Sequence, residues 1–250
     1  CEVEAVDRMI ALAKAAGKAP LYIVHVSAKE SVDLIREARK AGDTVFGETC
    51  PQYLVLDESR YDDPEEGLKF ILSPPLRAKE HQAAIWEGIK DGTLQVIATD
   101  HCSFDYHGDK QNGKDDFTKC PNGAPGVETR MPIVFSEGVS KGRMSLNKFA
   151  AVTSTNPAKI FGMYPKKGVL AVGSDADIVL MNPDMEVTIT KNILHENVDY
   201  TPYEGIKVKG WPVMTMVRGQ VVVENERLQV PLGFGRYIYR KPVQYTELLK

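Results

Sequence analysis

Two apolar segments of this chain end abruptly in side chains that can bind a metal ion or move a proton. The stretch V-I-A-T-D-H-C-S-F, from Val96 to Phe104, delivers Asp100 after four mostly apolar residues, and L-Y-I-V-H-V-S delivers His25 in the same way. Both segments are typical of buried strands. Because catalytic groups lie at the carboxyl ends of the strands in a parallel α/β barrel, these two residues are the leading candidates for chemistry.

Each candidate also has a simpler interpretation. A histidine at the end of an apolar strand is more often merely hydrogen-bonded than bound to metal. Asp100 could be the N-cap of a following helix, where a carboxylate accepts hydrogen bonds from backbone N–H groups. A carboxylate buried without a partner is costly, so Asp100 needs a cation, a metal ion or a set of donors.

Imidazole nitrogen together with carboxylate oxygen suits Zn²⁺. A catalytic zinc ion needs three protein ligands and a water molecule, and the other histidines do not clearly supply the third. His81 begins a polar helix, His107 lies in a loop and His195 lies in a β region. His101 directly follows the acid, so its side chain should leave the strand in another direction. No H-x-H or H-E-x-x-H motif occurs, so a metal site requires residues outside this chain.

Other chemistries have weaker support. Cys50 and Cys102 each follow an expected strand, but neither has a local base, so we interpret both as small buried thiols near a pocket rather than nucleophiles. The segment 123–126 (G-A-P-G) lacks the G-x-x-x-x-G-K-[ST] pattern, and no Rossmann fingerprint occurs. Nucleotide-phosphate binding is therefore not expected.

Alternating strands and helices in residues 1–100 must position these side chains, and this alternation indicates βαβ units and a parallel sheet. Apolar periodicity and capping residues place the helices. The expected helices are 2–16, 29–41 and 80–90, and the expected strands are 21–26, 44–48 and 95–99. Residues 105–127 are rich in Gly, Asp, Asn and Lys, and a long loop directly after a chemical strand end indicates function.

The later part of the chain changes in character. Helices are expected at 130–141 and 145–153, and Asn156-Pro157 opens another. From about Gly168 a second, all-β element is expected. Its segments are 176–181, 186–189 and 214–223, separated by Asn182-Pro183 and interrupted by Arg218-Gly219.

The composition excludes several classes of partner. The chain has 250 residues, a net charge of −3, 43% hydrophobic residues and 26% charged residues, which gives no general affinity for nucleic acid. No apolar run approaches the roughly 20 residues of a membrane span, and no signal peptide opens the chain. Four widely spaced cysteines without C-x-x-C spacing favour reduced thiols and a cytoplasmic location. Since no Met opens the chain, we expect the later part of a longer protein.

Motifs in order along residues 1 to about 240 resemble the C-terminal half of a dihydropyrimidinase or D-hydantoinase. These enzymes are cyclic amidohydrolases of the metal-dependent TIM-barrel superfamily. The motifs are Y-I-V-H-V-S, G-E-T-C-P-Q-Y-L, S-P-P-L-R, A-T-D-H-C-S-F, P-N-G-A-P-G-V-E-T-R, G-S-D-A-D-I-V and V-D-Y-T-P-Y-E-G.

The resemblance implies an α/β fold: the later part of a (β/α)₈ TIM barrel, strands 6 to 8, followed by part of a small β-sandwich domain. Residues 1–165 would belong to the barrel, residues 166–230 to the sandwich, and residues 231–250 would form a C-terminal tail. The resemblance also implies a homotetramer, with residues 233–241 packing on a neighbouring subunit.

The resemblance assigns roles residue by residue. His25 matches the metal-binding histidine of the sixth strand, and Asp100 matches the aspartate of the eighth strand, which binds metal and shuttles a proton. Ser73 and Asn122 match positions whose backbone groups hold the cyclic imide or amide of the substrate. The implied cofactor is a binuclear Zn²⁺ site whose remaining ligands, including a carboxylated lysine, are not in this chain.

Two further residues, Cys102 and Phe104, would lie near the pocket. The implied reaction is zinc-dependent hydrolysis of the cyclic amide bond of dihydropyrimidines or 5-substituted hydantoins to N-carbamoyl amino acids, as in pyrimidine degradation.

The chain departs from the family pattern in what it lacks. The H-x-H of the first strand, the lysine of the fourth, the histidine of the fifth and the oxyanion-stabilising tyrosine have no counterparts. We therefore expect the isolated chain to be inactive unless the missing N-terminal segment of the same protein completes it. The alternative is a non-catalytic scaffold or interaction protein, like the related collapsin response mediator proteins, which lack the metal set. The presence of both His25 and Asp100 favours the enzyme.

Overall fold

The computed structural model describes residues 1–245 and 248. Its contacts divide the chain into two compact units. The first unit comprises residues 1–130 and 188–207, and the second comprises residues 131–187 together with the described residues from 208 onward.

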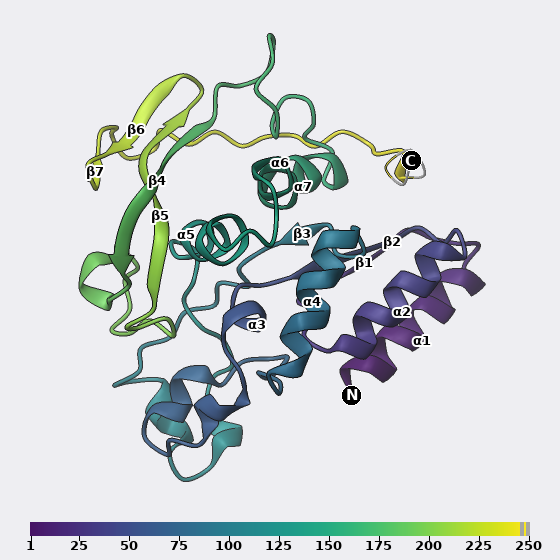
Figure 1. Ribbon diagram of the computed structural model, residues 1–250, viewed down its shortest axis with the longest axis horizontal. Helices are drawn as coiled ribbons and strands as arrows, with labels where there is room; N and C mark the ends of the chain where they lie inside the picture. Colours follow the sequence, from purple (N-terminus) through teal and green to yellow (C-terminus); the bar gives the residue numbers. More distant parts are fainter. Residues whose placement is uncertain (246–247, 249–250) are drawn as a thin grey trace. The chain divides into compact units, whose positions relative to one another are not determined.

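The first unit contains a three-stranded parallel sheet (Figure 1). Its strands are β1 (Leu21–Ile23), β2 (Val45–Thr49) and β3 (Val96–Ile97), in the order β1-β2-β3. Central β2 is buried over most of its length, as a strand with neighbours on both sides should be. The three predicted strands are confirmed, although β1 and β3 are shorter than expected. The carboxyl ends of β1 and β3 therefore point to the same edge of the sheet.

Three amphipathic helices follow the expected pattern in this unit. They are α1 (Glu2–Ala15), α2 (Lys29–Lys40) and α4 (Glu80–Asp91), and α2 packs against both of the others. Their inward faces repeat at helical spacing: Val32 and Ile35 on α2, and Ile85 and Ile89 on α4, are fully or almost fully buried. The predicted alternation of strands and helices is confirmed.

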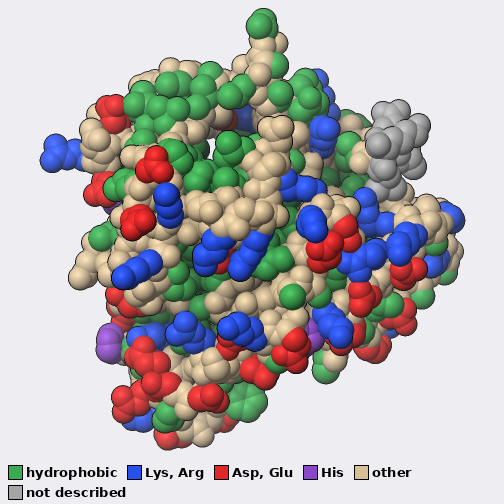
Figure 2. All heavy atoms as spheres, viewed as in Figure 1, with side chains coloured by type: hydrophobic (Ala, Val, Ile, Leu, Met, Phe, Trp, Pro, Cys, Tyr) green, Lys and Arg blue, Asp and Glu red, His purple; other side chains and the backbone are tan. Residues whose placement is uncertain are grey.

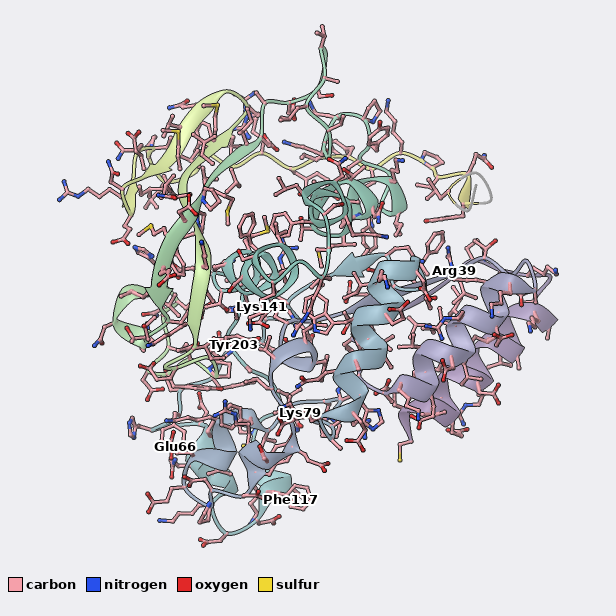
Figure 3. The ribbon with its side chains drawn as sticks, viewed as in Figure 1. Arg39, Glu66, Lys79, Phe117, Lys141 and Tyr203 are labelled. Atoms are coloured by element: carbon pink, nitrogen blue, oxygen red, sulfur yellow. The ribbon has the colours of Figure 1, made fainter. Side chains whose placement is uncertain are left out.

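Short helices connect these elements. They are α3 (Gln52–Val55), η1 (Glu58–Tyr61), η2 (Glu66–Phe70), η3 (Lys110–Gly113), η4 (Phe117–Lys119) and η7 (Lys191–Ile193). The loop expected at 105–127 contains η3 and η4. Phe117, labelled in Figure 3, lies at the outer end of this loop with 70% of its surface exposed, whereas the loop's Lys110 is completely buried.

The second unit begins with helices, and two of these α-helices continue as π-helices. Helix α5 (Arg130–Val134) continues as the π-helix η5 (Phe135–Ser140), and α6 (Leu146–Ala150) continues as the π-helix η6 (Ala151–Thr155) before α7 (Asn156–Ile160). The predicted helices at 130–141 and 145–153 are therefore present but not uniformly α-helical. In η6, the Thr153 hydroxyl donates to the Phe149 carbonyl oxygen at 2.7 Å, so a side chain bonds to an acceptor of the helical ladder.

The second unit also carries a four-stranded sheet. Its strands are β4 (Ile178–Thr188), β5 (Lys207–Val217), β6 (Gln220–Glu224) and β7 (Arg227–Leu228), in the order β4-β5-β6-β7. Arg218 and Gly219 join β5 to antiparallel β6 with φ of 50° and 79°, the left-handed pair that a two-residue hairpin turn requires. The predicted interruption at this turn is confirmed.

The predicted break at Asn182-Pro183 is wrong, because β4 runs through both residues. Strand β4 lies at the edge of its sheet. Proline has no N–H to donate, and an edge strand is where a sheet tolerates it. The segments predicted at 176–181 and 186–189 therefore belong largely to one strand.

The face of the molecule in Figure 2 shows no dominance of one charge. Figure 2 shows lysine and arginine side chains interspersed with aspartate and glutamate over the face it displays, in keeping with the net charge of −3. None of the described helices is long and apolar enough to cross a membrane.

Candidate active site

His25 and Asp100 lie just beyond the carboxyl ends of β1 and β3, two and three residues after Ile23 and Ile97 respectively. Both have left-handed backbone conformations, with φ of 41° at His25 and 49° at Asp100. Residues other than glycine rarely adopt this region, and such conformations cluster at functional sites. His25 is half-buried, whereas Asp100 is exposed.

The N-cap interpretation of Asp100 is wrong. No helix begins directly after it, because the next helical element, η3, starts at Lys110. Instead, His101 forms a β-bridge with Ala124. Asp100 therefore follows a strand and does not cap the start of a helix.

Glu48 is a member of this site that the sequence analysis missed. It lies on β2, between the strands that carry His25 and Asp100, and accepts a hydrogen bond from the Tyr22 hydroxyl at 2.5 Å. The backbone N–H of His25 also donates to its carboxylate. Burial raises the pKa of Glu48, and the carboxylate of Asp100 raises it further. The signal was present in V-F-G-E-T, where an acid follows an apolar strand start just as Asp100 does.

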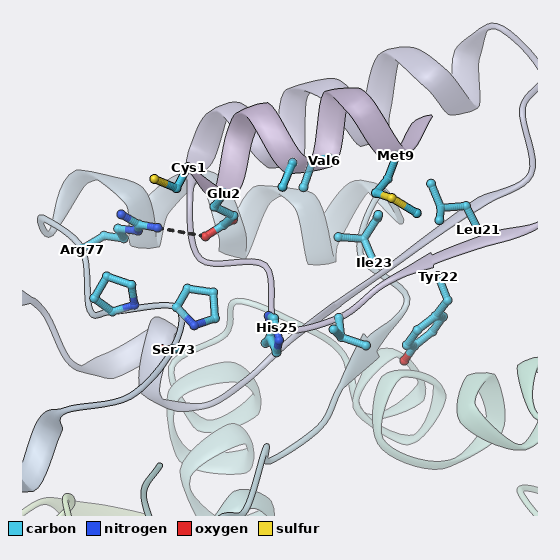
Figure 4. Close-up of a pocket in the computed structure, with 14 residues that line it drawn as sticks. Cys1, Glu2, Val6, Met9, Leu21, Tyr22, Ile23, His25, Ser73 and Arg77 are labelled. Carbon is cyan, nitrogen blue, oxygen red and sulfur yellow. Dashed lines mark hydrogen bonds and ion pairs between the residues drawn. The ribbon is translucent and has the colours of Figure 1, made fainter. Parts of the chain in front are cut away.

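Figure 4 shows a groove beside His25, with a volume of about 580 Å³. Its walls come from the first turns of α1, from residues 21–25 and from Ser73–Pro75. At one end Arg77 forms an ion pair with Glu2 at 3.1 Å. The groove thus brings His25 and Ser73, two of the predicted site residues, to one surface.

Ser73 and Asn122 contact each other directly. The Ser73 hydroxyl donates to Oδ1 of Asn122 at 3.0 Å, and both residues are exposed. The backbone N–H of Gly123 donates to the carbonyl oxygen of Ile71 at 3.1 Å. Two segments 49 residues apart in sequence therefore meet at the pair expected to hold the substrate.

The residues after Asp100 are tied to the segment that carries Asn122. The N–H of Cys102 donates to the carbonyl oxygen of Ala124 at 3.2 Å. Nδ1 of His101 accepts a hydrogen bond from the N–H of Gly126 at 3.1 Å. The side chain of His101 thus hydrogen-bonds to the segment after Ala124 and is directed away from the end of β3, as expected. Phe104 lies 5.9 Å, ring centroid to Nζ, from the buried Lys110.

The predicted burial is confirmed for Cys50 and wrong for Cys102, which is exposed. Burial, together with the carboxylates of Glu48 and Asp100, raises the pKa of Cys50 well above its usual range, so its thiol stays protonated and is a poor nucleophile. The guanidinium of Arg130 donates to the carbonyl oxygen of Ile97 at 2.9 Å, and burial lowers its pKa.

The site supplies part of a metal donor set. An imidazole and a carboxylate at one sheet edge fit zinc by donor type. Within residues 1–245 and 248, however, no three His, Cys, Asp or Glu side chains converge closely enough to hold an ion. The imidazole and carboxylate are therefore suitable types of ligand for a metal ion, but these two groups are too few to hold it.

Comparison with known proteins decides the family. The sequence profile described as "Amidohydrolase family" matches residues 11–222. The chain belongs to the amidohydrolase family. Its relatives include the D-hydantoinase of Geobacillus stearothermophilus, which is 50% identical over 96% of this chain and 51% of its own length. The D-phenylhydantoinase of Escherichia coli O1:K1 is 50% identical over 97% of this chain and 52% of its own length.

Solved structures agree with this family assignment. The dihydropyrimidinase of Brevibacillus agri matches with a TM-score of 0.94 and 50% identity, over 96% of this chain and 52% of its own. The L-hydantoinase of Arthrobacter aurescens matches with a TM-score of 0.87 and 38% identity, over 95% and 52% respectively. This amidohydrolase chain thus has a TIM-barrel-type fold and spans about half the length of the relatives it matches. The resemblance to dihydropyrimidinases and D-hydantoinases is confirmed.

Proposed function

We propose that this amidohydrolase chain forms part of an enzyme that hydrolyses the ring amide of dihydropyrimidines or 5-substituted hydantoins to N-carbamoyl amino acids. The observation that carries the proposal is the arrangement of His25 and Asp100 around Glu48, at the carboxyl ends of parallel strands. Relatives named D-hydantoinase and D-phenylhydantoinase, of whose lengths this chain spans 51% and 52%, support the substrate class.

In this proposal β1, β2 and β3 are strands 6 to 8 of the barrel. Residues 1–165 belong to the barrel, residues 166–230 to the β-sandwich and residues 231–250 to the tail, of which residues 246, 247, 249 and 250 lie outside the described part. The parallel order of β1, β2 and β3 supports this assignment.

His25 and Asp100 would hold zinc through an imidazole nitrogen and a carboxylate oxygen. The other ligands of the binuclear site, including a carboxylated lysine, would come from the missing N-terminal segment of the same protein. Zinc, when bound, lowers the pKa of a water molecule enough for it to attack near neutral pH.

The residues of this chain orient the substrate and move the proton. The exposed carboxylate of Asp100 accepts a proton from the attacking water and passes it to the leaving ring nitrogen. Backbone groups at Ser73 and Asn122 hold the planar –CO–NH–CO– unit, which every substrate of this class shares. Since these backbone groups do not contact the substituent on the ring, the enzyme should accept substrates with different substituents.

Three further properties belong to the same proposal. They are a homotetramer, a cytoplasmic location and a place in pyrimidine degradation, all proposed because the chain resembles hydantoinases. The free thiols of Cys1, Cys50, Cys102 and Cys120 support a reducing compartment.

The native full-length polypeptide that carries this chain, loaded with zinc, tests the proposal. Incubation with hydantoin or dihydrouracil should produce the N-carbamoyl amino acid, detected by chromatography. A zinc-loaded, folded protein that produces neither product would instead support the alternative, a non-catalytic dihydropyrimidinase-like scaffold or interaction protein.

A further inference from the structure

A lysine with no surface exposure lies beneath the loop after β3. Lys110 is 0% exposed, and its Nζ donates to the carbonyl oxygens of Ile71 and Pro121, at 2.7 Å in both cases. Lysine is almost never fully buried unless it is paired. Both acceptors are neutral backbone groups, and no carboxylate among the described residues forms an ion pair with this ammonium group.

The two carbonyl groups belong to the segments that carry the expected substrate-binding residues. Ile71 precedes Ser73 by two positions, and Pro121 directly precedes Asn122. The carbonyl oxygen of Ile71 also accepts from the N–H of Gly123. One ammonium group therefore bridges the two backbones immediately behind the Ser73–Asn122 contact.

The backbone beside this bridge has little freedom to adjust. Gly123 has φ of 142°, and a Cβ there would lie 2.4 Å from the carbonyl oxygen of Cys102. The centroid of the Phe104 ring lies 5.9 Å from Nζ of Lys110. The position of Asn122 is therefore set by Lys110 on one side and by the end of the β3 segment on the other.

We propose that Lys110 is a positioning residue for substrate binding, which bridges the Ile71 and Pro121 carbonyls and thereby sets the spacing of Ser73 and Asn122. The inference rests on the proposed function, because Ser73 and Asn122 must hold the –CO–NH–CO– unit. Lys110 itself touches neither the substrate nor the reacting atoms.

The test measures KM and kcat for hydantoin in the native full-length polypeptide with Lys110→Met. Methionine fills a similar volume but removes the ammonium donor from both carbonyls, and the Ile71 carbonyl oxygen keeps only the N–H of Gly123. Hydrogen bonds to charged groups justify an expected KM increase of about tenfold or more, with kcat within about threefold because Asp100 and the metal ligands are untouched. Lys114→Met, at an exposed position of the same loop, is the matched control and should change neither constant.

A purely structural role for Lys110 would give a different pattern. It would lower the folded fraction, and hence the apparent kcat, while KM stayed unchanged, and that result would overturn the inference. If Lys110→Met does not fold, Lys110→Gln decides, because its shorter neutral side chain cannot span both carbonyls; an unchanged KM in that variant also overturns the inference. If the wild-type protein does not hydrolyse hydantoin, that result contradicts the proposed function, and it can be distinguished from a failure of the inference about Lys110.

Discussion

The hydroxyl of Tyr22 donates a hydrogen bond to the carboxylate of Glu48 at 2.5 Å. Glu48 is half-buried, and the N–H of His25 donates to the same carboxylate. The bond therefore links β1 to β2 directly beneath the backbone that presents the His25 imidazole, and it satisfies a charge that burial would otherwise disfavour.

Removing this hydroxyl should weaken the fold. Tyr22→Phe leaves a half-buried carboxylate short of one donor, so the free energy of unfolding should fall by about 1–3 kcal/mol. Urea unfolding at neutral pH measures the change. Tyr237→Phe, on an 80% exposed tyrosine, is the control and should have no effect; equal stability of the two variants would contradict the role of Tyr22.

Asp100→Asn should remove turnover while preserving shape. The amide cannot accept and return the proton, so kcat for hydantoin in the native full-length polypeptide should fall by about 10³-fold. Asp115→Asn, at an exposed position of the following loop, should retain full activity. Near-normal hydrolysis by the Asp100 variant would exclude this residue as the proton carrier.

His25→Ala should lower the zinc content of the native full-length protein, measured by elemental analysis after dialysis. Its imidazole is an expected metal ligand, whereas the exposed His107 packs edge-on against Tyr106. His107→Ala is therefore the matched control, with zinc retained. Equal zinc in both variants would remove His25 from the ligand set.

Glu2 should make the free energy of unfolding depend on pH. Burial raises its pKa, but the hydrogen bonds from Ser27 and Ala28 outweigh burial, so its pKa lies below the ordinary value of 4.5. A lowered carboxylate pKa contributes stability above pH 4.5, and this contribution is lost as the pH falls through the pKa of the folded state.

Glu2→Gln should consequently destabilise the protein by about 1–2 kcal/mol at pH 7. The difference from wild type should shrink steadily below pH 4.5, as measured by denaturant unfolding across the range. Glu4→Gln, whose side chain is 65% exposed, should cost little at any pH. A Glu2 effect that does not vary with pH would refute the linkage.

Residues 1–250 alone should not hydrolyse hydantoin, with or without added zinc. The described part of the chain offers two expected ligands and no group of three, and β1 has a neighbour on one side only. Hydantoin hydrolysis should appear only when a second polypeptide is added that corresponds to the part of the relatives that this chain does not span. Turnover by the purified 250-residue chain would refute this expectation.

The strands and the polar residues that follow them could be predicted because both depend on local sequence pattern. A buried parallel strand has a continuous apolar run, and a polar residue at its end is conspicuous, as at His25 and Asp100. The predicted strand break at Pro183 was wrong because proline disrupts central strands but is tolerated in edge strands. The sequence alone does not show that β4 lies at the edge of its sheet.

The remaining site residues depend on tertiary contacts. Lys110 lies among Gly, Asp and Asn residues in a stretch that resembles a solvated loop, and its burial follows from the packing of segments at 71 and 121. Glu48 could have been found, since its strand repeats the pattern that identified Asp100. The π-helical segments after Val134 and Ala150 left no periodicity that distinguishes them from α-helix.

The left-handed backbone at His25 and Asp100 has a consequence for how such a chain can change. Glycine would relax both positions at little steric cost, so selection for a more stable fold alone would tend to replace the two residues that the proposed chemistry needs. Stabilised variants chosen without an activity screen should therefore lose these two side chains early.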